Sequence, residues 1–202
     1  MKIILIGGKG TIGKKVGAHL ARKHDVVTAG RSSGDVIVDM TSAESVRSMY
    51  EAVANVDAVV CIAGEARWAP LASMTEDDFY VGIRSKLMGQ VNLVRIGQKY
   101  LSHGGSFTLT TGILADDPVD MTTSAAMVNG AIHSFVRAAA LELKNGLRIN
   151  AVSSGLVEDA VEKYADYFPG HNPVPMSKVC NGYVKSIEGK GTGQIIRIYD
   201  NC

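Results

Sequence analysis

The thirteen residues MKIILIGGKGTIG (Met1–Gly13) decide the fold of this chain. Within them, Ile3–Ile6 is a short, apolar and mostly β-branched run that two glycines stop, which is typical of a strand buried on both faces. Lys14–Lys23 follows with apolar side chains on one helical face. A strand, a tight turn and a helix N-terminus together offer backbone N–H groups and a positive dipole end to a phosphate. The stretch therefore predicts a nucleotide-binding turn.

The glycines are spaced Gly7-x-x-Gly10-x-x-Gly13 and not G-x-G-x-x-G. A glycine motif alone is weak support for nucleotide binding, and an ordinary βα turn that binds nothing is the alternative. The second predicted strand, Val26–Ala29, favours binding because Arg31, and no acidic residue, follows it. In dinucleotide folds an acid at this place holds the ribose hydroxyls, whereas an Arg suits a 2′-phosphate.

Strands and helices alternate along the rest of the chain. The other expected strands lie near residues 36–38, 57–61, 106–110, 147–153 and 194–199. The other expected helices lie near 42–53, 75–101 and 124–144, and the proline-containing segment 156–175 is expected to be a loop. Strands separated by helices imply a parallel sheet covered on both faces. We therefore expect an α/β fold with a doubly wound sheet.

Composition indicates one domain over residues 1–202. The chain is 46% hydrophobic and 20% charged with a net charge of +1, so no charge imbalance points to nucleic acid or to an acidic membrane surface. No apolar run approaches the ~18 residues of a membrane span. Cys61, Cys180 and Cys202 show no metal-ligand spacing. We expect thiols in a reducing cytoplasm, no metal site, no membrane partner and no nucleic-acid partner.

Six short stretches, together with the glycine turn, make nearly the whole chain resemble the short-chain dehydrogenase/reductase family. They are Ile62-Ala63-Gly64, Gly105-Ser106-Phe107, Phe135-Val136-Arg137-Ala138, Leu141-Glu142-Leu143, Arg148-Ile149-Asn150-Ala151-Val152 and Thr192-Gly193-Gln194. The resemblance implies a Rossmann fold with seven strands in the order 3-2-1-4-5-6-7 and a nicotinamide dinucleotide cofactor. It also implies a homodimer or homotetramer built through two long helices.

The resemblance further implies which residues hold the cofactor. Arg31 favours NADP(H) over NAD(H), and Asp39 and Met40 match the positions that hold the adenine. Thr11 replaces the family's usual middle glycine, which the turn tolerates because the phosphate is held mainly by backbone. The expected cofactor residues are Gly7, Gly8, Lys9, Gly10, Thr11, Ile12, Gly13, Arg31, Ser32, Asp39, Met40, Ala63, Gly64, Asn129 and Val157.

The catalytic positions depart from the family pattern. Where active members have a Tyr and a Lys on the helix after the fifth strand, this chain has Ala125 and Asn129. The family's Ser falls at Thr111 or Gly112, and its Asn falls at Lys86. Hydride transfer to a carbonyl builds an alkoxide that has to be hydrogen-bonded and protonated. Because Ala125 has no proton to give, we expect a degenerate active site.

Thr111, Lys86 and Asn129 remain as candidate catalytic residues. A buried Lys86 could donate a proton if its pKa falls, although a lysine that extends its ammonium to water is the more ordinary interpretation. Thr111 could orient a carbonyl or simply close a strand, and Asn129 could hold ribose hydroxyls. We expect His133 at a surface or interface and Asp116 in a solvated turn.

Three functions are compatible with these residues. The first is an NADP(H)-dependent oxidoreductase that acts on a carbonyl or alcohol of a small molecule by an unusual proton route. The second is a catalytically silent NADP(H)-binding regulator or redox sensor. The third is an interaction domain that binds no nucleotide.

Overall fold

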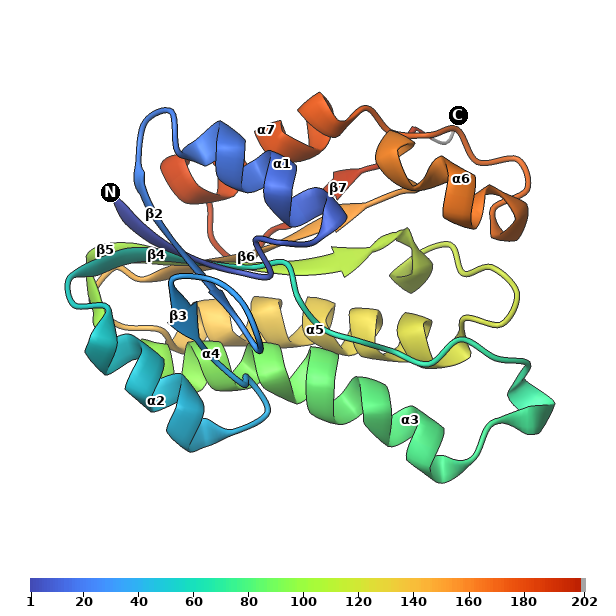
Figure 1. The fold of residues 1–202 in the computed structure, drawn as a ribbon, viewed down its shortest axis with the longest axis horizontal. Coiled ribbons are helices and arrows are strands. Elements are labelled where there is room, and N and C mark those ends of the chain that lie inside the picture. Colours follow the sequence, from blue (N-terminus) through green and yellow to red (C-terminus); the bar gives the residue numbers. More distant parts are fainter. Residues whose placement is uncertain (201–202) are drawn as a thin grey trace.

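The computed structural model describes residues 1–200, which contain a parallel sheet of seven strands (Figure 1). The strand order is β3-β2-β1-β4-β5-β6-β7, and all neighbouring strands are parallel. The strands are β1 (Lys2–Ile6), β2 (Asp25–Gly30), β3 (Val36–Ile37), β4 (Val56–Cys61), β5 (Leu101–Gly112), β6 (Arg148–Ser154) and β7 (Ile195–Ile198). The predicted doubly wound fold and strand order are confirmed.

Helices cover both faces of this sheet (Figure 1). On one face lie α1 (Thr11–Leu20) and α7 (Met176–Glu188), with the single turn α6 (Val161–Tyr164) beside them. On the other face lie α2 (Ala43–Ala52), α3 (Glu76–Gly82), α4 (Gly89–Gly97) and α5 (Thr123–Glu142). A π-helical segment, Ile83–Met88, joins α3 directly to α4.

Successive residues of β1 are buried alternately in two hydrophobic cores, one on each face of the sheet. Ile4 and Ile6 are buried in the core formed with α2, α4 and α5, whereas Ile3 and Leu5 are buried in the core formed with α1 and α7. Successive side chains of a strand point to opposite faces, so the uninterrupted apolar run of β1 serves both cores. Each buried Ile or Leu side chain stabilises the fold by roughly 1.5–3 kcal/mol.

Two predicted helix boundaries are wrong. The first helix begins at Thr11 and not at Lys14, because Gly10 already has the extended backbone of an N-cap and its carbonyl accepts from Lys14 N. The helix predicted to continue through Leu101 ends at Gly97, and β5 begins at Leu101. An apolar residue such as Leu101 is compatible with either a helix face or a strand. In the structure, Leu101 pairs with Val56 of β4 and therefore belongs to the strand.

The segment 156–175 is not wholly a loop, and no helix was predicted after it. Short helical turns occupy Glu158–Tyr167, between the strand exit and the prolines. Helix α7 then buries Met176, Val179, Cys180, Tyr183 and Ile187. Their helical spacing is a signal that could have predicted this helix from sequence.

Within residues 1–200, no helix has the length and apolar character needed to cross a bilayer. The same residues contain no cluster of His, Cys, Asp or Glu that could hold a metal ion. Cys61 and Cys180 are buried thiols, and Cys202 lies outside the described residues.

Candidate functional site

Two glycines of the first turn have no room for a side chain. Gly7 has a φ of +85°, and a Cβ atom there would lie 2.6 Å from the carbonyl oxygen of Ile62. A Cβ atom on Gly13 would collide with the carbonyl oxygen of Gly7, so α1 packs directly against the turn. The N-terminus of α1, which no side chain caps, therefore presents its first-turn N–H groups at the carboxyl end of β1.

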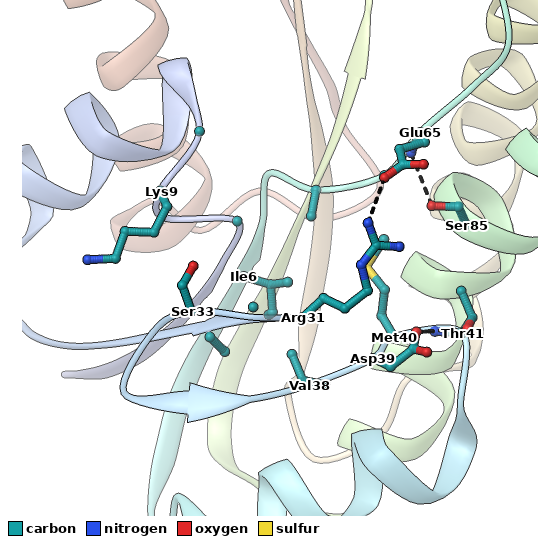
Figure 2. A pocket seen from close by; sticks show the side chains of 16 residues that line it. Ile6, Lys9, Arg31, Ser33, Val38, Asp39, Met40, Thr41, Glu65 and Ser85 are labelled. Carbon is teal, nitrogen blue, oxygen red and sulfur yellow. Dashed lines mark hydrogen bonds and ion pairs between the residues drawn. The ribbon is translucent and has the colours of Figure 1, made fainter.

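A pocket of about 210 Å³ opens beside this turn, at the carboxyl ends of β1, β2 and β4 (Figure 2). We call it the glycine-turn pocket. Ligands of open α/β sheets bind at this edge. Its lining includes eight of the predicted cofactor residues: Gly7, Lys9, Gly10, Arg31, Asp39, Met40, Ala63 and Gly64.

Asp39 presents a fixed carboxylate to the glycine-turn pocket. Its Oδ1 accepts hydrogen bonds from the hydroxyl of Thr41 at 2.7 Å and from the backbone N of Thr41 at 2.9 Å. These bonds lower the pKa of Asp39. The carboxylate is therefore ionised at neutral pH and can accept further hydrogen bonds.

Arg31 reaches across the mouth of the same pocket to Glu65 (Figure 2). Arg31 Nη2 lies 3.1 Å from Glu65 Oε1, and the backbone N of Glu65 donates to the hydroxyl of Ser85 at 3.1 Å. Ser85 belongs to the π-helical segment, a feature frequent at functional sites. Glu65 and Ser85 could not be predicted as site residues, because nothing local shows that residues 31, 65 and 85 converge.

A second cavity of about 490 Å³, the inner cavity, shares Gly64 and Glu65 with the glycine-turn pocket. Its lining includes all three candidate catalytic residues together with two further predicted cofactor residues: Thr111, Lys86, Asn129, Ile12 and Val157. Trp68 and Phe168 supply an apolar wall, with ring centroids 6.4 Å apart. The remaining predicted cofactor residues, Gly8, Thr11, Gly13 and Ser32, line neither space.

Lys86 faces the inner cavity and does not lie on an open helix surface. Its stem lies against Gly64, where an added Cβ would be 2.9 Å from Lys86 Cβ. Burial lowers the pKa of the Lys86 ammonium. Lys86 is thus half-buried beside the exit of β4 and lines the inner cavity, so it is not a fully solvated surface lysine.

Asn129 brings an unsatisfied acceptor to the inner cavity. Its side chain is buried, with 3% exposed, and Oδ1 has no hydrogen-bond partner among residues 1–200. Buried polar atoms without a partner are rare and each requires an explanation. A hydroxyl of a bound ligand would satisfy this atom. Ala125, one helical turn earlier, contributes only a methyl group to the same wall.

His133 is buried within the chain, so its expected place at a surface or interface is wrong. Only 5% of the residue is exposed, and its Nε2 lies 2.8 Å from the hydroxyl oxygen of Thr111. Asp116 is not merely a solvated turn residue, because its carboxylate makes two hydrogen bonds of 2.9 Å with Arg197 and accepts a third from Tyr199. Long-range packing brings these groups together, and no local sequence pattern shows it.

A doubly wound parallel sheet with a tight glycine turn and a pocket at its carboxyl edge defines the class of Rossmann-type dinucleotide-binding proteins. Within that class, a family model described as enoyl-(acyl carrier protein) reductase matches residues 10–173. The chain belongs to the short-chain dehydrogenase/reductase family. Members of this family bind a nicotinamide dinucleotide.

Similar proteins span nearly the whole chain. The protein lin1944 from Listeria innocua is 47% identical, with a TM-score of 0.97 over 98% of this chain and 100% of that chain. A small-chain dehydrogenase in complex with NADPH is 25% identical, with a TM-score of 0.87 over 100% of this chain and 97% of that chain. Glucose and ribitol dehydrogenase homolog 2 of Arabidopsis thaliana is 26% identical over 87% of this chain, which spans 66% of that protein's length.

Proposed function

We propose that this protein is an NADP(H)-dependent oxidoreductase that reduces a carbonyl group, or oxidises an alcohol, in the inner cavity. The observation that carries the proposal is the junction of two spaces at Gly64 and Glu65. One space lies at the glycine turn, and the other contains the candidate catalytic groups. A dinucleotide is long enough to place its adenosine in the first and its nicotinamide in the second.

The residues present fit such a cofactor. Gly7 and Gly13 leave a cradle that side chains would fill, and the partnerless Oδ1 of Asn129 matches a ribose hydroxyl. The backbone of residues 7–13 would hold the diphosphate, Asp39 and Met40 the adenosine, and the backbone of Val157 the nicotinamide amide. When bound, the cofactor supplies or accepts a hydride.

The proposed preference for NADP(H) over NAD(H) rests on the positive charge of Arg31, which follows β2 directly. Arg31 lines the glycine-turn pocket, and a guanidinium binds phosphate by two parallel hydrogen bonds. Ser32 would assist it from the same loop. A relative of 25% identity is a dehydrogenase in complex with NADPH, which supports this choice.

A catalytically silent NADP(H)-binding regulator is the second candidate, because Ala125 has no proton to transfer and Asn129 has no charge. The two functions differ in turnover and share the cofactor. In either case we propose a homodimer or homotetramer in the cytoplasm, which light scattering of the purified protein and fractionation of cells would test.

Calorimetric titration with NADPH and NADH, followed by NADPH-oxidation assays with aldehydes, ketones and diketones, tests the proposal. We expect micromolar NADPH binding, weaker NADH binding and turnover of at least one carbonyl class. Arg31→Asp should remove the preference for NADPH. Binding without turnover would favour the regulator, and binding of neither nucleotide would favour an interaction domain.

A further inference from the structure

Building on the function proposed above, we propose that Thr111 and His133 form a proton relay that serves the inner cavity in place of the family's tyrosine. The basis is the hydrogen bond of 2.8 Å between Thr111 Oγ1 and His133 Nε2. Both residues are buried, with 4% and 5% exposed. A buried hydroxyl that is bonded to an imidazole can pass a proton without releasing it to water.

Thr111 lies between His133 and the inner cavity. Thr111, near the carboxyl end of β5, lines the inner cavity. His133, on α5, does not line that cavity and is reached through Thr111. On α5 it stands about two helical turns after Ala125, the residue at the family's tyrosine position. The imidazole thus backs the cavity wall from which the phenol is missing.

A partly exposed charged cluster lies close enough to His133 to act on it electrostatically. Arg197 and Asp116 form its ion pair, and their side chains are 41% and 32% exposed. The hydroxyl of Tyr199 donates to Asp116 at 2.6 Å and lies 2.7 Å from the hydroxyl of Ser153. Asp116 and Arg197 are both close enough to act on His133 electrostatically. His133 is therefore hydrogen-bonded to the wall of the inner cavity on one side and coupled electrostatically to a partly exposed charged cluster, through which we propose that it is reprotonated.

The charge of His133 is set by groups on three elements. Burial lowers its pKa, as do Arg197 on β7 and Arg137 on α5, while Asp116 after β5 raises it, and the net pKa is below the ordinary value. The imidazole is therefore mostly neutral at pH 7 and becomes protonated as the pH falls. Neutral imidazole and imidazolium are the two forms that a proton relay alternates between.

In the reduction of a carbonyl by this relay, one hydride and one proton are added. The carbonyl carbon gains a hydride, and its oxygen takes the proton of the Thr111 hydroxyl. Thr111 Oγ1 takes the Nε2 proton of the His133 imidazolium, which becomes neutral imidazole and regains one proton from water. The sum is one carbonyl, one hydride and one proton to one alcohol, and alcohol oxidation runs the same path in reverse.

Lys86 is the competing proton donor, since it lines the same cavity and burial lowers its pKa. Its stem, however, lies against Gly64, at the junction with the glycine-turn pocket. The two assignments differ in which side chain controls the pH dependence. A Lys86→Met variant separates them, because it leaves the bond between Thr111 and His133 in place.

One readout needs neither cofactor nor substrate. Long-range ¹H–¹⁵N NMR of the histidine rings, from neutral pH down to the lowest pH at which the protein stays folded, should show that His133 titrates below its ordinary value of 6.5. Thr111→Val should shift the Nε2 resonance of His133, whereas Thr111→Ser should restore it. An Nε2 resonance of His133 that Thr111→Val leaves unchanged would overturn the relay, because the relay requires the bond between Thr111 and His133.

The second readout is the pH profile of NADPH-dependent reduction of diacetyl and 4-nitrobenzaldehyde. We expect the wild-type kcat to fall as the pH rises through the pKa of His133. His133→Gln and Thr111→Val should lower kcat by about 10²- to 10⁴-fold and remove that dependence, whereas Thr111→Ser should stay within about tenfold. His103→Gln, an exposed histidine at the start of β5, is the matched control and should change nothing.

These outcomes separate the relay from the proposed function. If the wild type turns over and His133→Gln keeps its rate and pH profile, the relay is wrong and the oxidoreductase assignment stands. If Lys86→Met alone removes the pH dependence, Lys86 is the donor and the relay is again wrong. If NADPH binds and the wild type reduces no carbonyl of the aldehyde, ketone and diketone panel, the chemical part of the proposed function fails and the relay fails with it.

Discussion

Arg31 Nη2 lies 3.1 Å from Glu65 Oε1 across the mouth of the glycine-turn pocket (Figure 2). The guanidinium that we assign to a 2′-phosphate is thus already paired with a carboxylate of the chain. The two side chains are 73% and 64% exposed, and ion pairs this exposed are weak. A phosphate that forms charge-assisted hydrogen bonds with Arg31 can displace Glu65.

Glu65→Gln should therefore strengthen NADPH binding. The variant frees Arg31 and removes a negative charge near the phosphate, so we expect the Kd of NADPH to fall by about two- to fivefold. The Kd of NADH should stay unchanged. Calorimetry at low salt measures both values, and Glu142→Gln, an exposed residue at the end of α5 that lines neither space, is the control. An equal gain for NADH would show that Glu65 does not act through the 2′-phosphate.

Gly13→Ala should damage the first turn. Its Cβ would collide with the carbonyl oxygen of Gly7, and relief of such overpacking typically costs about 1–3 kcal/mol. We expect lower stability in urea and at least about tenfold weaker NADPH binding. Gly130→Ala on α5 is the matched control, because a Cβ there meets no atom within 4 Å among the described residues. Unchanged NADPH binding by Gly13→Ala would contradict the assignment of this turn.

Asn129→Leu should change stability and binding in opposite directions. It removes a buried acceptor that has no partner within residues 1–200, so the free protein should be as stable as the wild type or more stable. NADPH should bind about three- to tenfold more weakly, because one hydrogen bond to the ribose is lost.

Ser124→Ala is the control for Asn129→Leu. Ser124 Oγ is also buried without a partner in the described chain, but Ser124 does not line the inner cavity. Loss of the Ser124 hydroxyl should leave NADPH binding unchanged. Thermal unfolding measures the stability of both variants, and calorimetry measures their affinity for NADPH. Equal NADPH binding by Asn129→Leu and the wild type would exclude Asn129 from the cofactor site.

Because of the ion pair between Asp116 and Arg197, the free energy of unfolding should depend on pH in the acid range. Hydrogen bonds from Arg197 lower the pKa of Asp116 from 3.8 to about 2. Because the folded pKa lies below the unfolded one, the stabilisation is present above about pH 4 and is lost as the pH falls to about 2. After discounting for solvent screening, we expect about 1 kcal/mol.

Asp116→Asn tests this contribution. Urea unfolding at pH 6 should show the variant to be less stable than the wild type by about 1 kcal/mol, and the difference should shrink toward pH 2. A difference that stays constant over this range would mean that the carboxylate charge is not responsible.

The architecture of this protein could be predicted from sequence because its determinants are local. The apolar run of Ile3–Ile6, the spacing of Gly7, Gly10 and Gly13, and the alternation of strands and helices each act over a few residues. They were enough to predict a parallel α/β sheet and a nucleotide-binding turn near Arg31, whereas the strand order came from the family resemblance. The helical spacing in α7 was equally local and could have been used.

Tertiary structure alone decided the surroundings of the chemical groups. Thr111 and His133 are 22 residues apart, and Arg31 and Glu65 are 34 residues apart. Whether such side chains meet depends on how β5 and α5, or the exits of β2 and β4, pack against one another. Burial and electrostatics arise only when separate segments exclude water together. For that reason the sequence predicted where a nucleotide would lie, and only the folded chain placed an imidazole behind the cavity wall.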